Sequence, residues 1–333
     1  MPVYVLKQTN VCVLKGGKEA IHSNRILVQI INEAIQDVLP THTVTLIETK
    51  KREETLDLIQ AHDYVDVIIP RGSAGLIQYV VKNATVPVIE TGAGICHLYV
   101  DQDASLDMAL EIAKNAKIQR PSVCNAIETI LVHQKVAQEF LPKLQEIFKN
   151  VQIYGDEKTR KIIDCLEATE KSYATEYDDY ICNLKVVDDI EEAIEHIYNY
   201  STKHSESIIT GNKETAKYFM DSLDSACVYH NASTRFSDGG QFGFGAEVGI
   251  STQKLHARGH LVYRKLLIQN YIDLWKWTSK ELRLLLFYKK IISVLNILTL
   301  ISALTIMFSI LTNRRCLMDL LEFEDIKEIF FTI

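Results

Sequence analysis

One cysteine, Cys124, stands in a short polar loop, Gln119-Arg120-Pro121-Ser122-Val123-Cys124-Asn125, between two strongly patterned segments. Pro121 fixes its own φ and biases Arg120 away from helix, so the loop is expected to be a defined turn. A thiol in such a turn can attack a carbonyl carbon while backbone N–H groups stabilise the charge on the oxygen. The loop therefore indicates a nucleophilic cysteine, with a buried and inert cysteine as the alternative.

The segments on either side of this loop must position it. Apolar residues on one face predict a helix over 106–117, and the apolar run after the loop predicts a buried strand over 128–133. Similar short apolar runs alternate with helical patterns throughout residues 1–259, as is typical of a parallel sheet with crossover helices. We expect an α/β fold whose first half is Rossmann-like, although no GxGxxG follows any predicted strand.

The remaining elements are predicted from the same two periodicities. In the first half we expect strands at 11–14, 44–47, 65–69 and 86–89, and helices at 19–38, 53–61 and 74–81. In the second half we expect strands at 96–100, 151–154, 181–187, 207–210 and 226–230, and helices at 134–148, 157–167, 190–200 and 213–223.

Charge and cysteine usage argue against several functional classes. The net charge of −7 argues against nucleic acid as a partner. The seven cysteines stand singly, without CxxC or HExxH spacing, so neither a metal site nor a disulfide framework is predicted, and a reducing cytoplasm is favoured. The first residues lack a basic segment followed by an apolar one, so no signal peptide is expected.

The last part of the chain differs from the rest in composition. All 14 Gly and all 6 Pro lie in residues 1–259, and the net charge changes from −10 in 1–259 to +3 in 260–333. Residues 291–312 carry no charge and are flanked by Lys289, Lys290, Arg314 and Arg315, so they are a candidate transmembrane helix. We place a boundary between residues 259 and 260.

Four motifs, at 67–73, 87–92, 96–101 and 119–125, closely resemble the γ-glutamyl phosphate reductase family, also called glutamate-5-semialdehyde dehydrogenases. The resemblance runs from about residue 7 to residue 259. It implies the fold of the aldehyde dehydrogenase superfamily: a Rossmann-like cofactor domain plus an α/β catalytic domain, incomplete at the N-terminus. We expect a partial NADP-binding domain (1–90), a catalytic domain with closing cofactor and substrate segments (91–259), and a hydrophobic tail outside the family (260–333).

The resemblance implies NADPH-dependent reduction of L-glutamate 5-phosphate to L-glutamate 5-semialdehyde and phosphate, a step of proline biosynthesis. Cys124 would carry a thioacyl intermediate, because sulfur is both a strong nucleophile and a good leaving group. Glu90 stands where the superfamily has its general base, and Asn125 is grouped with these catalytic residues.

Cofactor and substrate residues are implied in the same way. Lys15 would reach the adenosine ribose or its phosphate, Gly72 and Ser73 would face the pyrophosphate at a helix N-terminus, and Glu176 would hold the nicotinamide ribose. Substrate anions would be bound by residues of the active loop, the glycine-rich loop and the last family motif: Arg120, Asn231, Arg235 and Arg258. Arg71 and Lys18 are expected to be solvated charges.

The two ends leave alternatives open. A complete family member begins earlier, with the first strand of the cofactor domain and an asparagine of the oxyanion hole, and continues with Pro-Met-Gly after the position of Gly259. We interpret residues 260–333 as a frameshift product, with a membrane anchor at 291–312 as the alternative. The resemblance further implies a homo-oligomer in the cytoplasm, coupled to glutamate 5-kinase. Three hypotheses remain: the reductase, an inactive truncated remnant of it, and a membrane-tethered relative.

Overall fold

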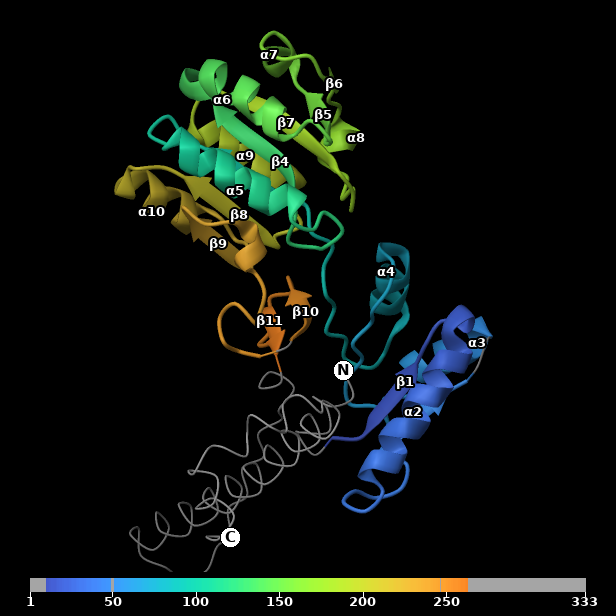
Figure 1. Ribbon diagram of the computed structural model, residues 1–333. Helices are drawn as coiled ribbons and strands as arrows, with labels where there is room; N and C mark the ends of the chain where they lie inside the picture. Colours follow the sequence, from blue (N-terminus) through green and yellow to red (C-terminus); the bar gives the residue numbers. More distant parts are fainter. Residues whose placement is uncertain (1–9, 49–50, 246, 263–333) are drawn as a thin grey trace, which may run out of the picture. The chain divides into compact units, whose positions relative to one another are not determined.

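The computed structural model describes residues 10–48, 51–245 and 247–262 (Figure 1). Within these ranges, no helix combines the length and the apolar character needed to cross a bilayer. The candidate membrane segment at 291–312 lies outside the described residues.

A seven-stranded sheet, with every neighbouring pair parallel, forms the centre of residues 91–262. Its strand order is β6-β5-β7-β4-β3-β8-β9. The strands are β3 (Cys96–Val100), β4 (Ile127–His133), β5 (Gln152–Gly155), β6 (Leu166–Glu167), β7 (Ile181–Val187), β8 (Ser205–Ile209) and β9 (Cys227–His230). Parallel neighbours require crossover connections, and the long helices between the strands supply them.

Helices cover both faces of this sheet. The long ones are α5 (Leu106–Ile118), α6 (Gln134–Ile147), α9 (Ile190–Tyr200) and α10 (Lys213–Ser222), and the short ones are α7 (Glu157–Arg160) and α8 (Glu170–Tyr173). Alternate strand residues enter two separate cores. Leu98 and Ile130 pack with α5 and α6, whereas Tyr99 and Leu131 pack with α9 and α10.

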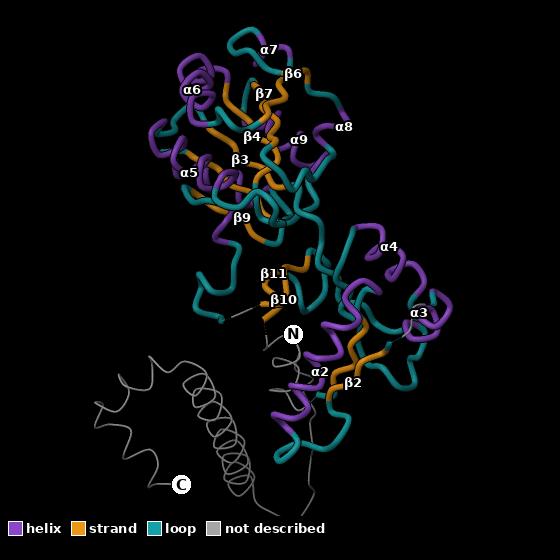
Figure 2. Tube along the Cα trace, turned by 45° about the vertical axis from the view of Figure 1, so that its right-hand side comes forward, coloured by secondary structure: helices purple, strands orange, loops and turns teal. Residues whose placement is uncertain are grey.

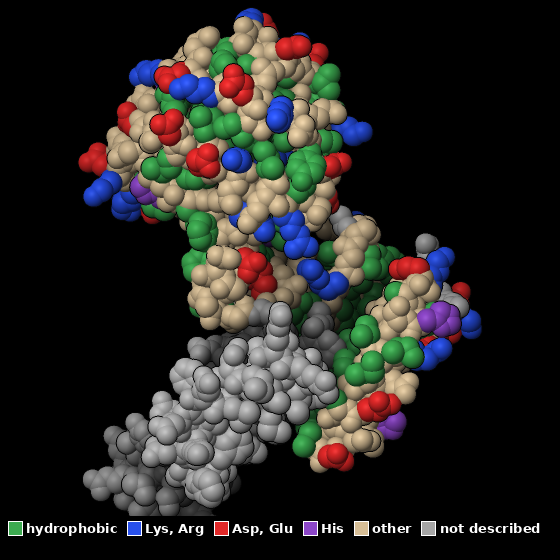
Figure 3. All heavy atoms as spheres, viewed as in Figure 1, with side chains coloured by type: hydrophobic (Ala, Val, Ile, Leu, Met, Phe, Trp, Pro, Cys, Tyr) green, Lys and Arg blue, Asp and Glu red, His purple; other side chains and the backbone are tan. Residues whose placement is uncertain are grey.

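The described parts of residues 10–90 carry two paired strands and three α-helices (Figure 2). They are β1 (Cys12–Lys15), the 3₁₀ turn η1 (Lys18–Ala20), α2 (Ile21–Ile35), β2 (Val44–Ile47), α3 (Arg52–Ile59) and α4 (Ala74–Asn83). β1 and β2 form a two-stranded sheet. Ile26, Leu27 and Ile30 of α2 are each more than half exposed, and apolar side chains are visible along this helix in Figure 3.

The predicted strands at 65–69 and 86–89 do not form; their segments meet only in an isolated bridge between Ile68 and Val88. The Ile68 N–H donates to the Pro87 carbonyl at 2.8 Å, and the Ile89 N–H donates to the Ile68 carbonyl at 2.9 Å. Pro70 and Pro87 supply no N–H, so each removes a possible donor from a longer ladder.

The predicted helix at 157–167 is also wrong. Asp156 caps a single turn by accepting a hydrogen bond from the Thr159 N–H at 2.9 Å, and α7 ends at Arg160. Leu166 and Glu167 instead pair with Tyr154 and Gly155 as the edge strand β6. These residues have a helical spacing of apolar side chains, but pairing with the edge of the sheet determines their conformation. The local sequence pattern gives no information about such a tertiary contact.

A hairpin missed by the sequence analysis closes the described chain. It follows the 3₁₀ turn η2 (Thr234–Phe236) and consists of β10 (Glu247–Ser251) and β11 (Gly259–Val262), paired antiparallel with Ile250 opposite His260. Gly259 has φ +84°, a conformation that favours glycine. Strand β11 runs across the boundary that we place after residue 259.

Candidate active site

The Cys124 loop joins the end of α5 to the start of β4. The Ala126 N–H donates to the Val123 carbonyl at 2.8 Å, which closes a turn around Cys124 and Asn125. Cys124 is half-buried in this turn. The predicted setting of the cysteine, a tight turn between a helix and a strand, is therefore confirmed.

The segment before β3 fixes the backbone of Cys124. A Cβ added to Gly94 would lie 1.4 Å from the Cys124 carbonyl oxygen, so only glycine allows this approach. The Cys96 thiol donates a hydrogen bond to the same oxygen at 3.2 Å. The Gly94 N–H donates to Glu176 Oε1 at 2.6 Å, which brings Glu176 to the loop.

Electrostatics keep the Cys124 thiol protonated. Burial raises the pKa of Cys124 to about 11, and the negative charges of Glu176 and Glu247 add to the effect. Arg71 acts in the opposite direction. Because the thiolate is the nucleophilic form, attack by Cys124 requires a group that accepts its proton.

Asn125 ties the loop to η2. Its side chain is buried, and its Nδ2 donates to the Ser237 carbonyl at 2.8 Å. The Thr234 hydroxyl donates to the backbone carbonyl of Asn125 at 2.7 Å. Arg235 Nη1 donates to the side-chain oxygen of Asn125, Oδ1. Asn125 therefore positions both its neighbour Cys124 and the guanidinium of Arg235.

Two guanidinium groups lie near the loop. Arg235 Nε donates to Gln119 Oε1 at 3.1 Å. Burial lowers the pKa of Arg235; the nearby Asp238 carboxylate opposes this lowering, and the positive charge of Arg120 adds to it. The guanidinium is half-buried, keeps its charge and has a second cation close by, which is an arrangement that attracts a phosphate or a carboxylate.

Arg71 is exposed, as expected of a solvated charge, and its guanidinium also contacts a neighbouring side chain. Its Nη1 donates to the Thr91 hydroxyl at 2.8 Å, and its charge lowers the pKa of Cys124. A Cβ on Gly249 of β10 would lie 2.7 Å from that nitrogen.

Glu90, the predicted general base, directly precedes Thr91. Its N–H donates to Gln253 Oε1 at 3.0 Å, and the residue is half-buried.

Three predicted cofactor residues lie in residues 10–90. Lys15 ends β1 and is exposed. Gly72 has φ +153°, and Ser73 is the N-cap of α4, its hydroxyl accepting a hydrogen bond from the Leu76 N–H at 3.4 Å. Glu176, the fourth, lies between α8 and β7, and its charge contributes to the raised pKa of Cys124.

Two predicted substrate residues bind other parts of the protein. Asn231 Oδ1 accepts from the Thr210 N–H and its Nδ2 donates to the Thr210 carbonyl, both at 3.0 Å. Arg258 donates to Asp224 Oδ1 at 2.8 Å and to the Asp224 carbonyl at 2.9 Å. These contacts brace the ends of β8 and of α10, and they do not bring Asn231 or Arg258 to the Cys124 loop.

A buried ion pair that the sequence analysis missed links the two elements that flank the Cys124 loop, α5 and β4. Lys117 Nζ in the last turn of α5 lies 2.8 Å from Glu128 Oε2 at the start of β4, and both side chains are almost fully buried. Burial raises the pKa of Glu128 to about 8, and the Lys117 charge opposes that shift. The available signal was a glutamate at the first position of a strand predicted to be buried.

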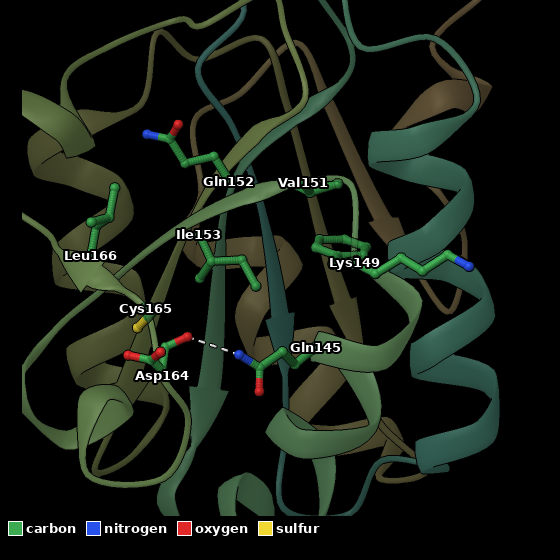
Figure 4. Close-up of a pocket in the computed structure, with 9 residues that line it drawn as sticks. Gln145, Lys149, Val151, Gln152, Ile153, Asp164, Cys165 and Leu166 are labelled. Atoms are coloured by element: carbon green, nitrogen blue, oxygen red, sulfur yellow. Dashed lines mark hydrogen bonds between the residues drawn. The ribbon is translucent and has the colours of Figure 1, made fainter.

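A hollow lies near the β5–β6 edge of the sheet (Figure 4). It is lined by residues of α6, β5 and the segment before β6, among them Gln145, Ile153 and Cys165. The Gln145 Nε2 donates to the Asp164 carbonyl at 2.8 Å across it. Among the described residues, no group of three or more His, Cys, Asp or Glu side chains could hold a metal ion.

Sequence comparisons agree with the motifs. The sequence model of the aldehyde dehydrogenase family matches residues 3–165. A γ-glutamyl phosphate reductase of Moorella thermoacetica is 56% identical over 271 residues, which are 80% of this chain and 65% of that protein. The chain thus spans somewhat less than two thirds of the length of that relative.

Structure comparisons give the same result. A crystal structure of γ-glutamyl phosphate reductase from Thermotoga maritima matches with a TM-score of 0.79 and 47% identity, covering 84% of this chain and 70% of that one. An engineered glycolyl-CoA reductase with bound NADP⁺ matches with a TM-score of 0.61 at 16% identity, over 80% of this chain and 68% of that one, which shows a shared fold alone. The predicted aldehyde dehydrogenase-like α/β fold is confirmed.

Proposed function

Because this chain belongs to the γ-glutamyl phosphate reductase family of the aldehyde dehydrogenase superfamily, we propose that it reduces L-glutamate 5-phosphate to L-glutamate 5-semialdehyde and phosphate with NADPH. This reaction would serve proline biosynthesis. The observation that carries the proposal is the loop in which Cys124 lies near the guanidinium groups of Arg120 and Arg235. An acyl phosphate presents a carbonyl carbon to the thiol and an anion to the guanidinium groups.

In the first step, Cys124 loses its proton and its sulfur bonds to the acyl carbon. The bond from that carbon to the phosphate oxygen then breaks, and phosphate leaves with the electron pair. Glu90 and Glu176 are the proposed proton acceptors. Burial raises the pKa of Glu176, which makes its carboxylate a better base for a thiol of high pKa.

Arg235 and Arg120 are proposed to hold the phosphoryl group during this step. A guanidinium already fixed by Asn125 and Gln119 needs little reorganisation when negative charge develops on the leaving group. Asn125 acts here as a positioning residue, since its polar atoms are bound to Ser237, Thr234 and Arg235.

NADPH, when bound, supplies the hydride that takes the thioacyl group to the aldehyde. Lys15, Gly72, Ser73 and Glu176 are proposed to hold it. The N-terminus of α4 fits a phosphate, because its first turn contains no acidic residue and a Cβ on Gly75 would meet nothing within 4 Å. Extensions of the same proposal are a homo-oligomer, a cytoplasmic location and coupling to glutamate 5-kinase.

The test is reduction of NADP⁺ in the presence of glutamate 5-semialdehyde and phosphate, the reaction run backwards. We expect the wild-type chain to reduce NADP⁺, Cys124→Ala to abolish the activity, and the matched control Cys165→Ala to retain it. Inactivity of a folded wild-type chain would contradict the proposal and favour an inactive remnant. Recovery of the activity only with membranes would favour the membrane-tethered alternative.

A further inference from the structure

A network of four buried polar side chains lies under the Cys124 loop. The Cys96 thiol, which donates to the Cys124 carbonyl at 3.2 Å, also lies 3.8 Å from His204 Nδ1, within hydrogen-bonding range for sulfur. His204 Nδ1 lies 2.9 Å from the Ser205 hydroxyl, and that hydroxyl lies 2.6 Å from the hydroxyl of Ser237. The network thus joins the first residues of β3 and β8 to the residue that follows η2.

Both ends of this buried network reach the loop. At one end, Cys96 holds the carbonyl of Cys124. At the other end, the Ser237 carbonyl accepts a hydrogen bond from Asn125 Nδ2 at 2.8 Å. The network therefore holds two consecutive residues of the loop, the proposed nucleophile and its neighbour. Hydrogen bonds to both residues fix the orientation of the turn as well as its position.

The network is closed off from solvent. Cys96, His204, Ser205 and Ser237 are each at most 1% exposed. Hydrogen bonds in such an interior are stronger than at the surface, because the local dielectric constant is low. A broken one is costly, because the group that loses its partner stays buried. We therefore expect these side chains to keep one arrangement.

The hydrogen bonds of His204 indicate which ring nitrogen carries the proton. Burial lowers the pKa of His204 to about 4, and the positive charge of His260 adds to this effect, so the ring is neutral at pH 7. The Cys96 thiol uses its proton on the Cys124 carbonyl, so its sulfur accepts, and the donor is His204 Nδ1–H. The Nε2 atom is buried and finds no hydrogen-bond partner among the described residues, so a proton there would be an unpaired donor.

The direction of the remaining hydrogen bonds follows from this proton. His204 Nδ1–H donates to Ser205 Oγ, and the Ser205 hydroxyl then donates to Ser237 Oγ. The Ser237 hydroxyl donates in turn to Tyr229 Oη, which lies 2.9 Å away. An apolar side chain at position 204 would remove the first donor of this series and would leave the Cys96 sulfur without its donor.

We propose that His204 is a positioning residue for the Cys124 loop, which it holds through Cys96 on one side and through Ser205 and Ser237 on the other. The inference rests on the proposed function for its effect on catalysis, whereas the ordering of the loop is a property of the free protein. His204 has no contact with the reacting atoms. It acts through Cys124 and through Asn125, the residue that binds Arg235.

The first test compares rates of NADP⁺ reduction with glutamate 5-semialdehyde and phosphate. His204→Leu should reduce kcat about 10²-fold, because a shift of about 1 Å in a reacting group has effects of that size. His204→Asn should retain most of kcat, because its side-chain N–H replaces Nδ1–H. The matched control His196→Phe changes another buried histidine, on α9, and should leave kcat unchanged. Equal losses in the two His204 variants, or a normal kcat in His204→Leu, would overturn the proposal.

Hydrogen–deuterium exchange tests the same role without catalysis. The Ala126 N–H donates to the Val123 carbonyl at 2.8 Å, so this amide is protected while the loop is ordered. Exchange in a peptide covering 119–127 should become about tenfold faster in His204→Leu and stay at the wild-type rate in His204→Asn and His196→Phe. If the wild type is inactive but shows this exchange pattern, the proposed function fails and the positioning role stands. Unchanged exchange in His204→Leu would overturn the role whatever the activity.

Cys96 supplies a second test if circular dichroism shows that His204→Leu is unfolded. Cys96→Ser keeps a donor for the Cys124 carbonyl, and Cys96→Ala removes it. We expect the loop to exchange faster in Cys96→Ala than in Cys96→Ser. Equal exchange in these two variants, both folded, would overturn the proposal.

Discussion

Residues 10–90 and residues 91–262 carry the same alternation of short apolar runs and amphipathic helices, but they bury it to different degrees. In 91–262, strand residues such as Leu98, Tyr99 and Ile130 are fully buried between helices on both faces of seven strands. In 10–90, two strands pair, and Ile26 and Ile30 of the adjacent helix α2 remain more than half exposed.

The difference teaches that periodicity predicts an element but not its burial. A two-stranded sheet has too little surface to bury an amphipathic helix, whereas a seven-stranded one buries helices on both faces. The same division applies to the chemistry. Cys124, Asn125, Arg235 and Glu176 all lie in 91–262, whereas Lys15 and Ser73 belong to the less buried region. Arg235 donates to Asn125, and Glu176 accepts from the N–H of Gly94, which lies against the Cys124 carbonyl.

Removing one charge of the buried pair should have the largest effect on stability. At pH 9, above the Glu128 pKa of about 8, Lys117→Met leaves the Glu128 carboxylate without its counter-charge, and we expect the free energy of unfolding to fall by about 3–5 kcal/mol in urea titrations. The double variant Lys117→Met/Glu128→Leu should regain much of that loss. In 10–90, breaking the exposed pair of Arg25 and Glu48 with Arg25→Gln should change nothing measurable. Equal effects of the two single variants would contradict the comparison.

Matched truncations of isoleucine sharpen the contrast in packing. Ile130→Ala in β4 should cost about 3 kcal/mol, because the side chain is fully buried and leaves a cavity. Ile30→Ala in α2, where the side chain is 54% exposed, should change the free energy of unfolding by less than about 0.5 kcal/mol. Chemical denaturation of both variants measures the difference, and a large cost at Ile30 would show that α2 is packed.

Alanine substitutions at two glycines compare a position in close contact with a neighbouring backbone with a position that has open space around it. Gly94→Ala would place a methyl group against the Cys124 carbonyl, displace the loop and reduce NADP⁺ reduction about 10²-fold. Gly75→Ala in α4 meets nothing and should stabilise the chain by about 0.5–1 kcal/mol through helix propensity. Assays and melting curves of both variants test this, and an active Gly94→Ala enzyme would refute the role of the close approach.

The close contact between His260 Nδ1 and Glu247 Oε2, at 2.9 Å, predicts a pH dependence of stability. The folded-state pKa of about 9 exceeds the ordinary value, so the stabilisation is complete below about pH 6.5 and is lost as the pH rises through 9. Allowing for solvent screening, His260→Gln should cost about 1 kcal/mol at pH 6 and almost nothing at pH 10. Urea titrations at both pH values test the sign, and a constant difference would show that the ring acts only by packing.

Much of the fold was readable from the sequence where burial is complete. The predicted bounds 96–100, 181–187 and 190–200 agree with β3, β7 and α9. In these three segments the residues that the apolar pattern marks as buried are buried in the structure. The failures at 65–69, 86–89 and 157–167 have tertiary or proline causes that a local period does not register.

The candidate site was predictable only in part. The loop around Cys124 was readable because Pro121 and the flanking patterns define it. The close approach of Gly94 to Cys124 and the hydrogen bond from Gly94 to Glu176 depend on contacts between residues far apart in sequence. Spacing along a chain does not encode such contacts, so these parts of the site required the structure.

The most direct test of the central claim is to locate the acyl group. Wild-type chain is incubated with NADP⁺ and glutamate 5-semialdehyde without phosphate, quenched in acid, digested and analysed by mass spectrometry. The account predicts a γ-glutamyl thioester on the peptide that contains Cys124 and no acyl group on the other cysteines. An acyl group on another cysteine, or NADP⁺ reduction with no acylated cysteine, would contradict it.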